Sequence, residues 1–264
     1  MQFFLVDAFT STAFAGNTAA VVLLDEPADD AWMQAVAAEF KHSETAFVQV
    51  EGGEPKPLRW FTPTTDVDLC GHATLATAHV LGGNQTFSTR SGDLHCTATD
   101  SGWVEMDFPA DRAAPLAPDA RLAAALPGVT IQQYARGVSD LLVVAAAPEQ
   151  VRALQPDLAA IAAFGARGLI VTAPPDRAGI DFISRCFYPA SGVDEESVTG
   201  SAHCTLAPYW SQRLGSNELV GVQASQRGGI VRTTLRGERV GLAGQAVTVA
   251  RGDLMVRPRQ PSEI

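Results

Sequence analysis

The sequence has little positive charge. Its 264 residues include 19 lysines and arginines against 29 aspartates and glutamates, a formal net charge of −10. Proteins that bind nucleic acid or an anionic membrane surface usually display a basic patch, and none is evident here. No apolar run reaches the roughly 20 residues of a membrane-spanning helix, and the chain opens on a strand-like FFLV segment instead of a basic leader. We therefore expect a cytoplasmic protein that binds neither nucleic acid nor a membrane.

Cysteine is scarce, and the potential metal ligands form no recognisable pattern. The four cysteines show no CxxC spacing, and a chain of this length does not need disulfides to support its core. The five histidines likewise lack zinc-site spacing. No GxGxxG or P-loop glycine pattern is present. The sequence predicts free thiols, no metal site and no bound cofactor.

The length exceeds the usual size of one hydrophobic core and fits two domains. An internal duplication supports this division. The segment LRWFTPTTDVDLCGHATLA (58–76) resembles SRCFYPASGVDEESVTGSAHCTLA (184–207), with an insertion in the second copy. The aligned positions are Arg59, Phe61, Pro63 and Gly71 against Arg185, Phe187, Pro189 and Gly200.

Fainter similarity extends upstream, where GNTAAVVL (16–23) resembles GVSDLLVV (137–144), although chance likeness of short strands also explains this part. We predict two halves, residues 1–112 and 113–264, with the join in the linker-like FPADRAAPLAP segment. The last strand could cross back to the first half.

Each half follows one order of expected elements. In the first, strands at 3–9 and 19–24 flank an Ala-Gly-Asn turn, and a helix through Phe40 is capped by Asp29 or Asp30. Two more strands precede a helix from Gly71 to Leu81 that is so uniformly small and apolar that it is expected to be buried. The second half has its core helix at 201–214. We predict an α+β fold of two pseudo-symmetric domains, each a curved mixed or antiparallel sheet wrapped around a central helix.

Gly71 and Gly200 each stand at a loop-to-helix junction. Free N–H groups and the positive end of the helix dipole attract a carboxylate there without any basic side chain. The alternative interpretation is that both glycines mark ordinary helix starts that bind no ligand, with Ser201 as a local helix cap.

Four segments resemble the PhzF-like family, named for an isomerase of phenazine biosynthesis and sharing its fold with diaminopimelate epimerase. They are VDAFTSTAFAGNTAAVVLL, SETAFV, FTPTTDVDLCGHATLATAHVL and VTGSAH, in the family's order over nearly the whole chain. The resemblance implies a cofactor-independent isomerase that moves a proton and a double bond in a small carboxylate-bearing substrate, by acid/base catalysis at the interdomain cleft. We also expect a homodimer.

The resemblance assigns roles residue by residue. Glu44 would be the main acid/base, His72 would assist, and Glu196 stands where the family has an aspartate. Backbone at Gly71, Gly200 and Ser201 would bind the substrate carboxylate, with the Ser201 hydroxyl as a further donor. Asn17 is the remaining expected substrate-binding residue.

The duplication gives a separate reason to single out Glu44. It falls opposite Arg167 in the second copy, so it has no symmetric acid partner, and residues unique to one copy serve chemistry more often than the fold. His72 lies in a first helix turn, where the dipole favours neutral imidazole. Each of these residues also has a purely structural interpretation. Glu44 could simply begin a strand, His72 could bond to loop backbone, and the acidic run at 194–196 could be a solvated loop.

Two other functions stay open. An amino-acid epimerase or racemase of this fold uses two thiols, one before each core-helix glycine; Cys70 occupies the first place, but Thr199 occupies the second and its hydroxyl is too weakly acidic. Cys70 is therefore expected to be a packing residue. A catalytically silent binding protein with the same fold is the other alternative.

Overall fold

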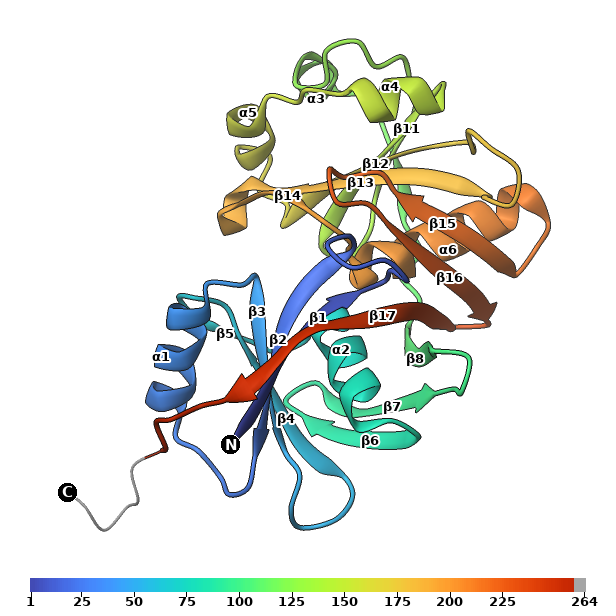
Figure 1. The fold of residues 1–264 in the computed structure, drawn as a ribbon. Coiled ribbons are helices and arrows are strands. Elements are labelled where there is room, and N and C mark those ends of the chain that lie inside the picture. Colours follow the sequence, from blue (N-terminus) through green and yellow to red (C-terminus); the bar gives the residue numbers. More distant parts are fainter. Residues whose placement is uncertain (259–264) are drawn as a thin grey trace. The chain divides into compact units, whose positions relative to one another are not determined.

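The computed structural model describes residues 1–258 and divides into two compact units, shown in Figure 1. Unit 1 comprises Met1–Asp107 and Ala243–Ile264, and unit 2 comprises Phe108–Leu242. The boundary expected at residue 112 lies at 107 in this division. The last strand begins in unit 2 and continues into unit 1, where its residues 246–253 pair along the first strand, Gln2–Ala8. Residues 259–264 of the expected second half lie outside the described residues.

Unit 1 contains one mixed sheet in the order β17, β1, β2, β3, β4, β6, β7, β8, with the short β5 also on β4. The pairs β2–β3 and β4–β6 are parallel and the other pairs are antiparallel. The elements are β1 (Gln2–Ala8), β2 (Asn17–Leu24), α1 (Asp30–Phe40), β3 (Glu44–Gln49), β4 (Lys56–Phe61), β5 (Asp66–Val67), α2 (Gly71–Leu81), β6 (Asn84–Thr89), β7 (Gly92–Ala98), β8 (Trp103–Pro109) and β17 (Arg239–Asp253).

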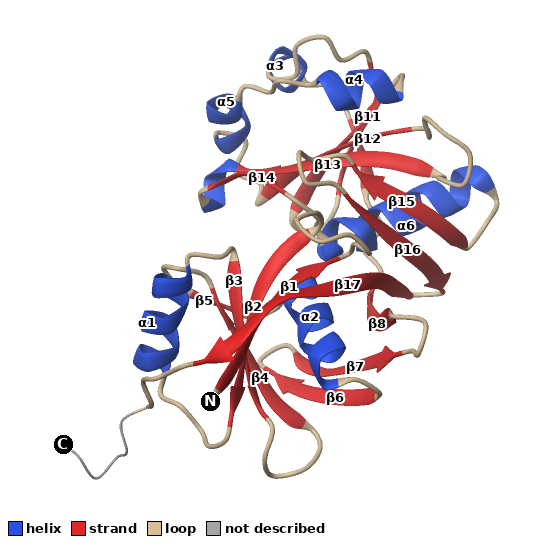
Figure 2. Ribbon diagram, viewed as in Figure 1, coloured by secondary structure: helices blue, strands red, loops and turns tan. Residues whose placement is uncertain are grey.

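The helix α2 is the core element of unit 1, as its composition predicts. It contacts β1, β2 and β3 as well as β6 and β7, so the sheet curves around it (Figure 2). Its residues 72–78 are all buried. The other helix, α1, packs Met33, Val36 and Ala37 against Phe47 and Phe61 in a separate cluster. The Asp29 carboxylate caps α1 by accepting a hydrogen bond from the Trp32 N–H, as expected.

Unit 2 contains a second mixed sheet in the order β9, β10, β11, β12, β13, β15, β16, with β14 also on β13. Here β11–β12 and β13–β15 are the parallel pairs. The elements are β9 (Ala114–Leu116), α3 (Ala120–Ala124), β10 (Ile131–Arg136), β11 (Asp140–Ala145), α4 (Pro148–Ala153), α5 (Leu158–Ala162), β12 (Gly168–Ala173), β13 (Phe182–Tyr188), a 3-10 turn (Pro189–Ser191), β14 (Val193–Glu196), α6 (Gly200–Leu214), β15 (Glu218–Gln223) and β16 (Gly229–Arg236).

The helix α6 is the core element of unit 2. Ala202, Leu206 and Trp210 pack on one cluster with side chains of β10 to β13, while the small helices α3, α4 and α5 cover a second cluster. Pro208 stands inside α6 and cannot donate to the Cys204 carbonyl. That carbonyl instead accepts a hydrogen bond from the Asp111 N–H at 3.0 Å, which fastens the incoming chain to the helix.

The two units share one sequence of strand pairings. In unit 1, β1–β2 is antiparallel, β2–β3 parallel and β3–β4 antiparallel; the short β5 pairs antiparallel with β4, and after the core helix α2 the strand β6 pairs parallel with β4. In unit 2, β10–β11 is antiparallel, β11–β12 parallel and β12–β13 antiparallel; the short β14 pairs antiparallel with β13, and after the core helix α6 the strand β15 pairs parallel with β13. Arg59 and Arg185, at matching positions of the two copies, both link a core strand to a helix that covers it. Arg59 forms a bidentate pair with Asp30 at the start of α1, and Arg185 pairs with Glu195 while bonding carbonyls at the end of α4. The sheet-rich α+β fold is confirmed; of the described helices, none has the length and apolarity to cross a membrane.

Candidate active site

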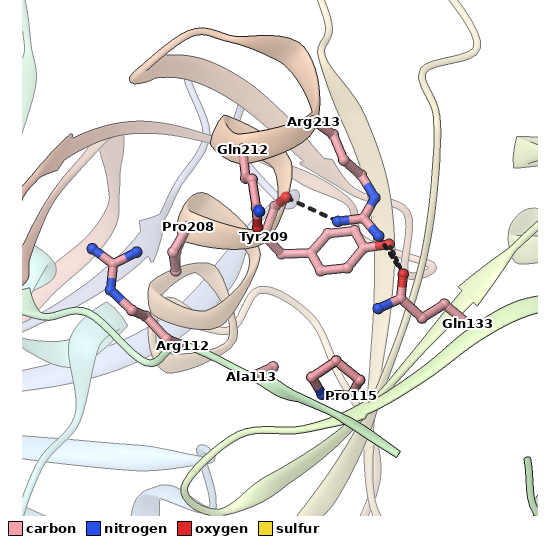
Figure 3. Close-up of a pocket in the computed structure, with 8 residues that line it drawn as sticks. All are labelled: Arg112, Ala113, Pro115, Gln133, Pro208, Tyr209, Gln212 and Arg213. Atoms are coloured by element: carbon pink, nitrogen blue, oxygen red, sulfur yellow. Dashed lines mark hydrogen bonds between the residues drawn. The ribbon is translucent and has the colours of Figure 1, made fainter. Parts of the chain in front are cut away.

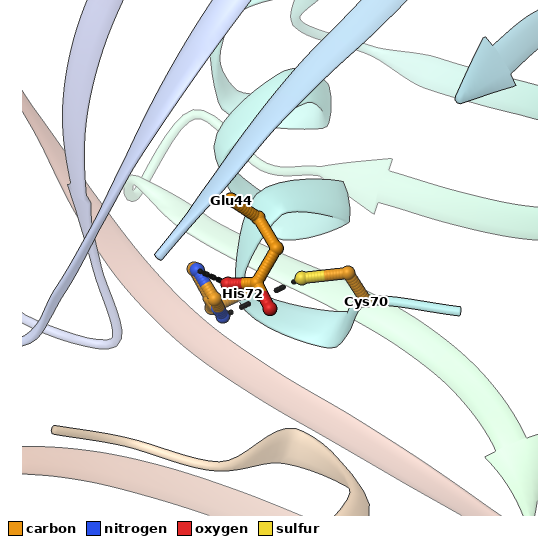
Figure 4. A group of neighbouring side chains, drawn as sticks. All are labelled: Glu44, Cys70 and His72. Atoms are coloured by element: carbon orange, nitrogen blue, oxygen red, sulfur yellow. Dashed lines mark hydrogen bonds and ion pairs between the residues drawn. The ribbon is translucent and has the colours of Figure 1, made fainter. Parts of the chain in front are cut away.

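A cluster of polar side chains surrounds His72 at the start of α2. Glu44 is the first residue of β3, and Cys70 and His72 flank the first residue of α2, so two elements bring three side chains together (Figure 4). Glu44 Oε2 lies 3.2 Å from His72 Nε2. Cys70 Sγ lies 3.5 Å from His72 Nδ1, on the other side of the ring. The expected neighbours Glu44 and His72 therefore meet within unit 1.

Asn17 and Ser43 complete the surroundings of the imidazole. The Asn17 amide nitrogen lies 3.2 Å from His72 Nδ1, and the Ser43 hydroxyl lies 3.3 Å from Nε2. Asn17 is placed by Gly16, whose φ of +65° suits glycine and whose absent Cβ would come 2.2 Å from the Ala8 carbonyl oxygen. The sequence predicts Asn17 as a substrate-binding residue, and the structure shows it holding His72.

The hydrogen-bond chemistry defines the state of His72. Both groups near Nδ1, an amide N–H₂ and a thiol, are donors, so Nδ1 accepts and Nε2 carries the proton. Burial lowers the pKa of His72, and the negative charge of Glu44 only partly opposes this effect. The imidazole is therefore neutral at pH 7, with its Nε2–H directed at the Ser43 hydroxyl and Glu44 Oε2 beside it. Neutral imidazole was expected from the helix dipole; burial is the larger cause.

One carboxylate oxygen of Glu44 is buried beside His72. Its side chain is 18 % exposed, and Oε2 is buried without a well-aligned hydrogen-bond partner among the described residues. The 3.2 Å approach of His72 Nε2 is close but not aligned as a hydrogen bond. The alternative that Glu44 only marks a solvated strand start does not fit this burial.

The same three side chains could hold a metal ion, since one donor atom each from Glu44, Cys70 and His72 lie within 4.8 Å of one another. Thiolate, imidazole and carboxylate are zinc ligands. However, a metal on Nδ1 would displace the Asn17 amide, and one on Nε2 would displace the Ser43 hydroxyl. Both ring nitrogens of His72 therefore already have a protein partner.

Of the other expected site residues, Gly71 begins α2 in unit 1, and Glu196, Gly200 and Ser201 lie in unit 2, at the end of β14 and the start of α6. Glu196 accepts a hydrogen bond from the Thr199 hydroxyl at 3.0 Å. The buried Gln223 side chain bonds the Thr199 N–H at 2.9 Å and the Glu196 carbonyl at 2.8 Å. Glu196 is thus fixed in its loop by Thr199 and Gln223. In the acidic run at 194–196, Glu195 is not solvated as expected, because it forms the bidentate pair with Arg185.

Ser201 has a basic neighbour that sequence reasoning missed. Arg167 donates to the Ser201 hydroxyl oxygen at 2.9 Å and also pairs with the buried Asp140 carboxylate. The hydrogen bond to Asp140 is the main cause that raises the pKa of Arg167. Since the Ser201 oxygen accepts from Arg167, its own O–H proton remains available as a donor.

The two core helices differ from three of the other helices at their N-termini. Aspartate side chains cap α1, α3 and α5. The N-caps of α2 and α6 are Cys70 and Thr199, both extended and without a side-chain capping bond, and glycine follows each. Their first N–H groups therefore have no side-chain acceptor of this kind, as the expected role of Gly71 and Gly200 requires.

One protein family matches nearly the whole chain. The model of the phenazine biosynthesis-like protein family matches residues 6–252. A protein of Halalkalibacterium halodurans named as an uncharacterized isomerase is 45 % identical over 264 residues, covering 96 % of this chain and 98 % of its own. A Pseudomonas aeruginosa protein named in the same way is 47 % identical and covers 96 % and 97 %.

The chain belongs to the phenazine biosynthesis-like family. A PhzF-family crystal structure from Enterococcus faecalis superposes with a TM-score of 0.92 at 38 % identity, covering 97 % of this chain and 99 % of that one. A probable proline racemase of Agrobacterium radiobacter, at 10 % identity and a TM-score of 0.65, shows a common fold and no more. Relatives of this identity and coverage assign the chain to the isomerase class, and its reaction has to be argued from the site.

Several neighbours of the predicted residues, in one unit or the other, were not predicted from the sequence. Ser43 stands inside the quoted SETAFV segment, so the signal was available. Cys70 was expected only to pack, but its sulfur faces the ring of His72. Gln223 and Arg167 come from strands or loops distant in sequence, and no local pattern marks them.

Proposed function

We propose that this chain is a cofactor-independent isomerase that moves a proton in a small carboxylate-bearing substrate, with Glu44 as the acid/base. The observation that carries the proposal is the buried Glu44 oxygen beside a neutral His72 whose Nδ1 accepts from Asn17. Proton transfer needs a group that can take and return a proton at hydrogen-bond distance, and this arrangement supplies one.

The proposed reaction keeps atoms and electrons in balance. Glu44 takes a proton from a carbon next to the substrate's double bond, and the electron pair left behind shifts the double bond. The same proton, or one exchanged with water, is then delivered to a second carbon, so nothing is oxidised or reduced. His72 can donate from Nε2 to the developing negative charge and recover its proton, because Asn17 holds the ring in that tautomer.

The participation of Glu196, Gly200 and Ser201 in binding or proton transfer on the same substrate stays a prediction, as does that of Gly71. Their local geometry supports it: Ser201 keeps a free hydroxyl proton, and α6 begins without a side-chain cap. A homodimer and a cytoplasmic location also stay predictions; light scattering coupled to gel filtration measures the first.

The test of the proposed function is proton exchange with solvent. A panel of small unsaturated and cyclic carboxylates is incubated with the protein in D₂O, and deuterium incorporation and double-bond position are read by NMR. We expect at least one compound to incorporate deuterium at carbon and change its double-bond position. Binding of panel members without any exchange would instead indicate a silent binding protein, and exchange with inverted configuration an epimerase.

Ser201→Ala tests the predicted carboxylate contact. One net hydrogen bond contributes about 1 kcal/mol, so we expect KM to rise about fivefold with kcat within about twofold. Steady-state kinetics on a panel compound that turns over measures both constants. Ser216→Ala, at an exposed serine just past the other end of α6, is the matched control and should change neither. An unchanged KM in Ser201→Ala would remove Ser201 from the binding site.

An epimerase remains the second candidate because Cys70 lies beside His72. Against it, Thr199 occupies the matching place in unit 2, and its hydroxyl proton is engaged with Glu196. Two-thiol chemistry therefore lacks a second thiol there.

Cys70→Ser separates these two functions. If Cys70 only supports the His72 ring, turnover should survive within about tenfold, equivalent to about 1.4 kcal/mol of barrier. Deuterium incorporation rates of the variant and the wild type measure this. Loss of exchange in Cys70→Ser, with exchange preserved in Glu44→Gln, would establish a thiol mechanism and reject the proposal.

A further inference from the structure

A cavity of about 670 Å³ lies within unit 2, apart from every residue assigned above. It is bounded by the second half of α6 and by the chain segment that leads into β9 (Figure 3). This volume falls within the range of roughly 300–1,000 Å³ typical of small-molecule sites. The lining residues are Arg112, Ala113, Pro115, Gln133, Pro208, Tyr209, Gln212 and Arg213.

The lining contains two arginines and no carboxylate, in a chain with an excess of acidic residues. Arg213 lies over the Tyr209 ring, with its guanidinium carbon 3.6 Å from the ring centroid. Its hydrogen bonds go to neutral oxygens, the Tyr209 carbonyl at 3.4 Å and the Gln133 side-chain oxygen. No ion pair to a carboxylate is present for Arg213 within the described part of the chain. It is a positive charge that protein groups do not neutralise.

Among the other polar groups, the Gln133 amide adds a donor, while the Tyr209 hydroxyl and Arg112 are engaged with protein acceptors. The Gln133 oxygen accepts from both the Tyr209 hydroxyl and Arg213, so the amide N–H₂ is what this side chain has left to offer. Burial raises the pKa of Tyr209, and its hydroxyl stays protonated. Arg112 bonds Glu238 and the Gly237 carbonyl, which neutralises its charge and holds it in place. A set of donors around an uncompensated arginine selects an anion.

Apolar surface fills the rest of the wall. The apolar part of the wall consists of the small side chain of Ala113, the rings of Pro115 and Pro208, and the Tyr209 ring beside them (Figure 3). The exposed face of a guanidinium stacked on an aromatic ring can itself stack on a planar ligand. An inorganic anion would leave this apolar surface uncovered.

We propose that this cavity is a second ligand site, which binds a small carboxylate with a flat apolar body, such as an aromatic acid. Arg213 receives the carboxylate, the Gln133 amide contributes a donor, and Pro208, Pro115 and Ala113 contact the apolar body. The site is independent of the proposed proton transfer, because it shares no residue with the His72 cluster.

Benzoate and inorganic phosphate are the probes that test it. Each is titrated to millimolar concentration into ¹⁵N-labelled protein, and the amide signals of Ala113 and Gln212 and the side-chain N–H₂ signals of Gln133 and Gln212 are followed by NMR. Benzoate should shift all of them with saturation, and phosphate should not. Equal saturating shifts with phosphate would show a simple anion site, and unmoved signals with benzoate would show no site; either result overturns the proposal.

Arg213→Gln should weaken benzoate binding at these signals at least tenfold. Arg177→Gln removes one positive charge from an exposed loop of the same unit and is the matched control, expected to bind as the wild type does. If Arg213→Gln does not fold, Arg112→Gln replaces it, with a smaller loss expected. Unchanged benzoate affinity in the folded variant rejects the assignment to this cavity, whatever happens to proton exchange.

Discussion

Replacing Glu44 by glutamine should lower the rate of deuterium incorporation by a factor of about 10² to 10⁴, the range usual for loss of a general acid or base. Glutamine keeps the shape of the side chain and can still bond to His72, but it cannot take a proton at neutral pH. The substitution turns the Glu44 carboxylate into an amide. Beside His72 it therefore removes a carboxylate oxygen and changes nothing else. The effect should fall on kcat rather than KM.

Glu39→Gln is the matched control, an exposed glutamate on α1 in the same unit. It should leave exchange and stability unchanged. Binding by Glu44→Gln is measured as the thermal shift produced by a compound that the wild type turns over, and that shift should persist. If Glu44→Gln exchanges deuterium as fast as the wild type while Glu39→Gln behaves normally, Glu44 is not the acid/base.

The core helices were predictable because their composition is extreme. A helix such as Gly71–Leu81, small or apolar all round, has to be buried, and a strand break at a proline before it sets its start. The order of elements in the second half was predicted from the internal duplication. The helices α3, α4 and α5 were not predicted, because they are only five or six residues long. α4 and α5 stand where the first copy has the single helix α1, and α3 precedes β10, where the first copy has no helix.

The contacts of the site were less predictable than its members. That His72 is held by Asn17 depends on how β2 and α2 pack, which is a long-range property of the fold. Likewise, the sequence predicts that Pro208 cannot donate a hydrogen bond to the Cys204 carbonyl within the helix. It does not predict that the Asp111 N–H donates to that carbonyl instead. Local patterns give the element and its buried face; they do not give the partner.

Strand register corrects one comparison between the copies. Phe47 pairs with Arg59 and Val171 pairs with Arg185, so Glu44, three residues before Phe47, matches Gly168 instead of Arg167. Cys70 and His72 match Thr199 and Ser201, since both core helices begin at their glycines. Glu44, Cys70 and His72 thus match Gly168, Thr199 and Ser201 in unit 2. If Glu44 and His72 move the proton as proposed, this strand and helix register gives them no carboxylate or imidazole counterpart there.

The wild-type protein should lose about 3 kcal/mol of its free energy of unfolding, from His203 alone, as the pH falls from about 6.5 to about 4. His203 is buried in α6, and burial lowers its pKa to about 4, against about 6.5 in the unfolded chain. Its Nδ1 bonds the Thr199 carbonyl at 2.8 Å, and Nε2 is buried without a partner among the described residues. Between these two pH values the unfolded state binds a proton that the native state refuses, so acid favours unfolding.

His203→Thr isolates this contribution. The matching residue in α2 is Thr74, whose hydroxyl donates to the Cys70 carbonyl at 2.5 Å, so threonine at 203 can make the bond to Thr199 that histidine makes. The smaller side chain should cost about 1–3 kcal/mol at pH 7 through the cavity it leaves, but it does not titrate. Burial also lowers the pKa values of His72 and His79, and these two residues are unchanged in both proteins. Urea unfolding at several pH values between 7 and 4 should therefore show a steeper loss of stability in the wild type than in His203→Thr, with the two curves converging toward low pH. Parallel curves would contradict the prediction, because they would mean that His203 is protonated as easily in the folded protein as in the unfolded chain, despite its buried Nε2.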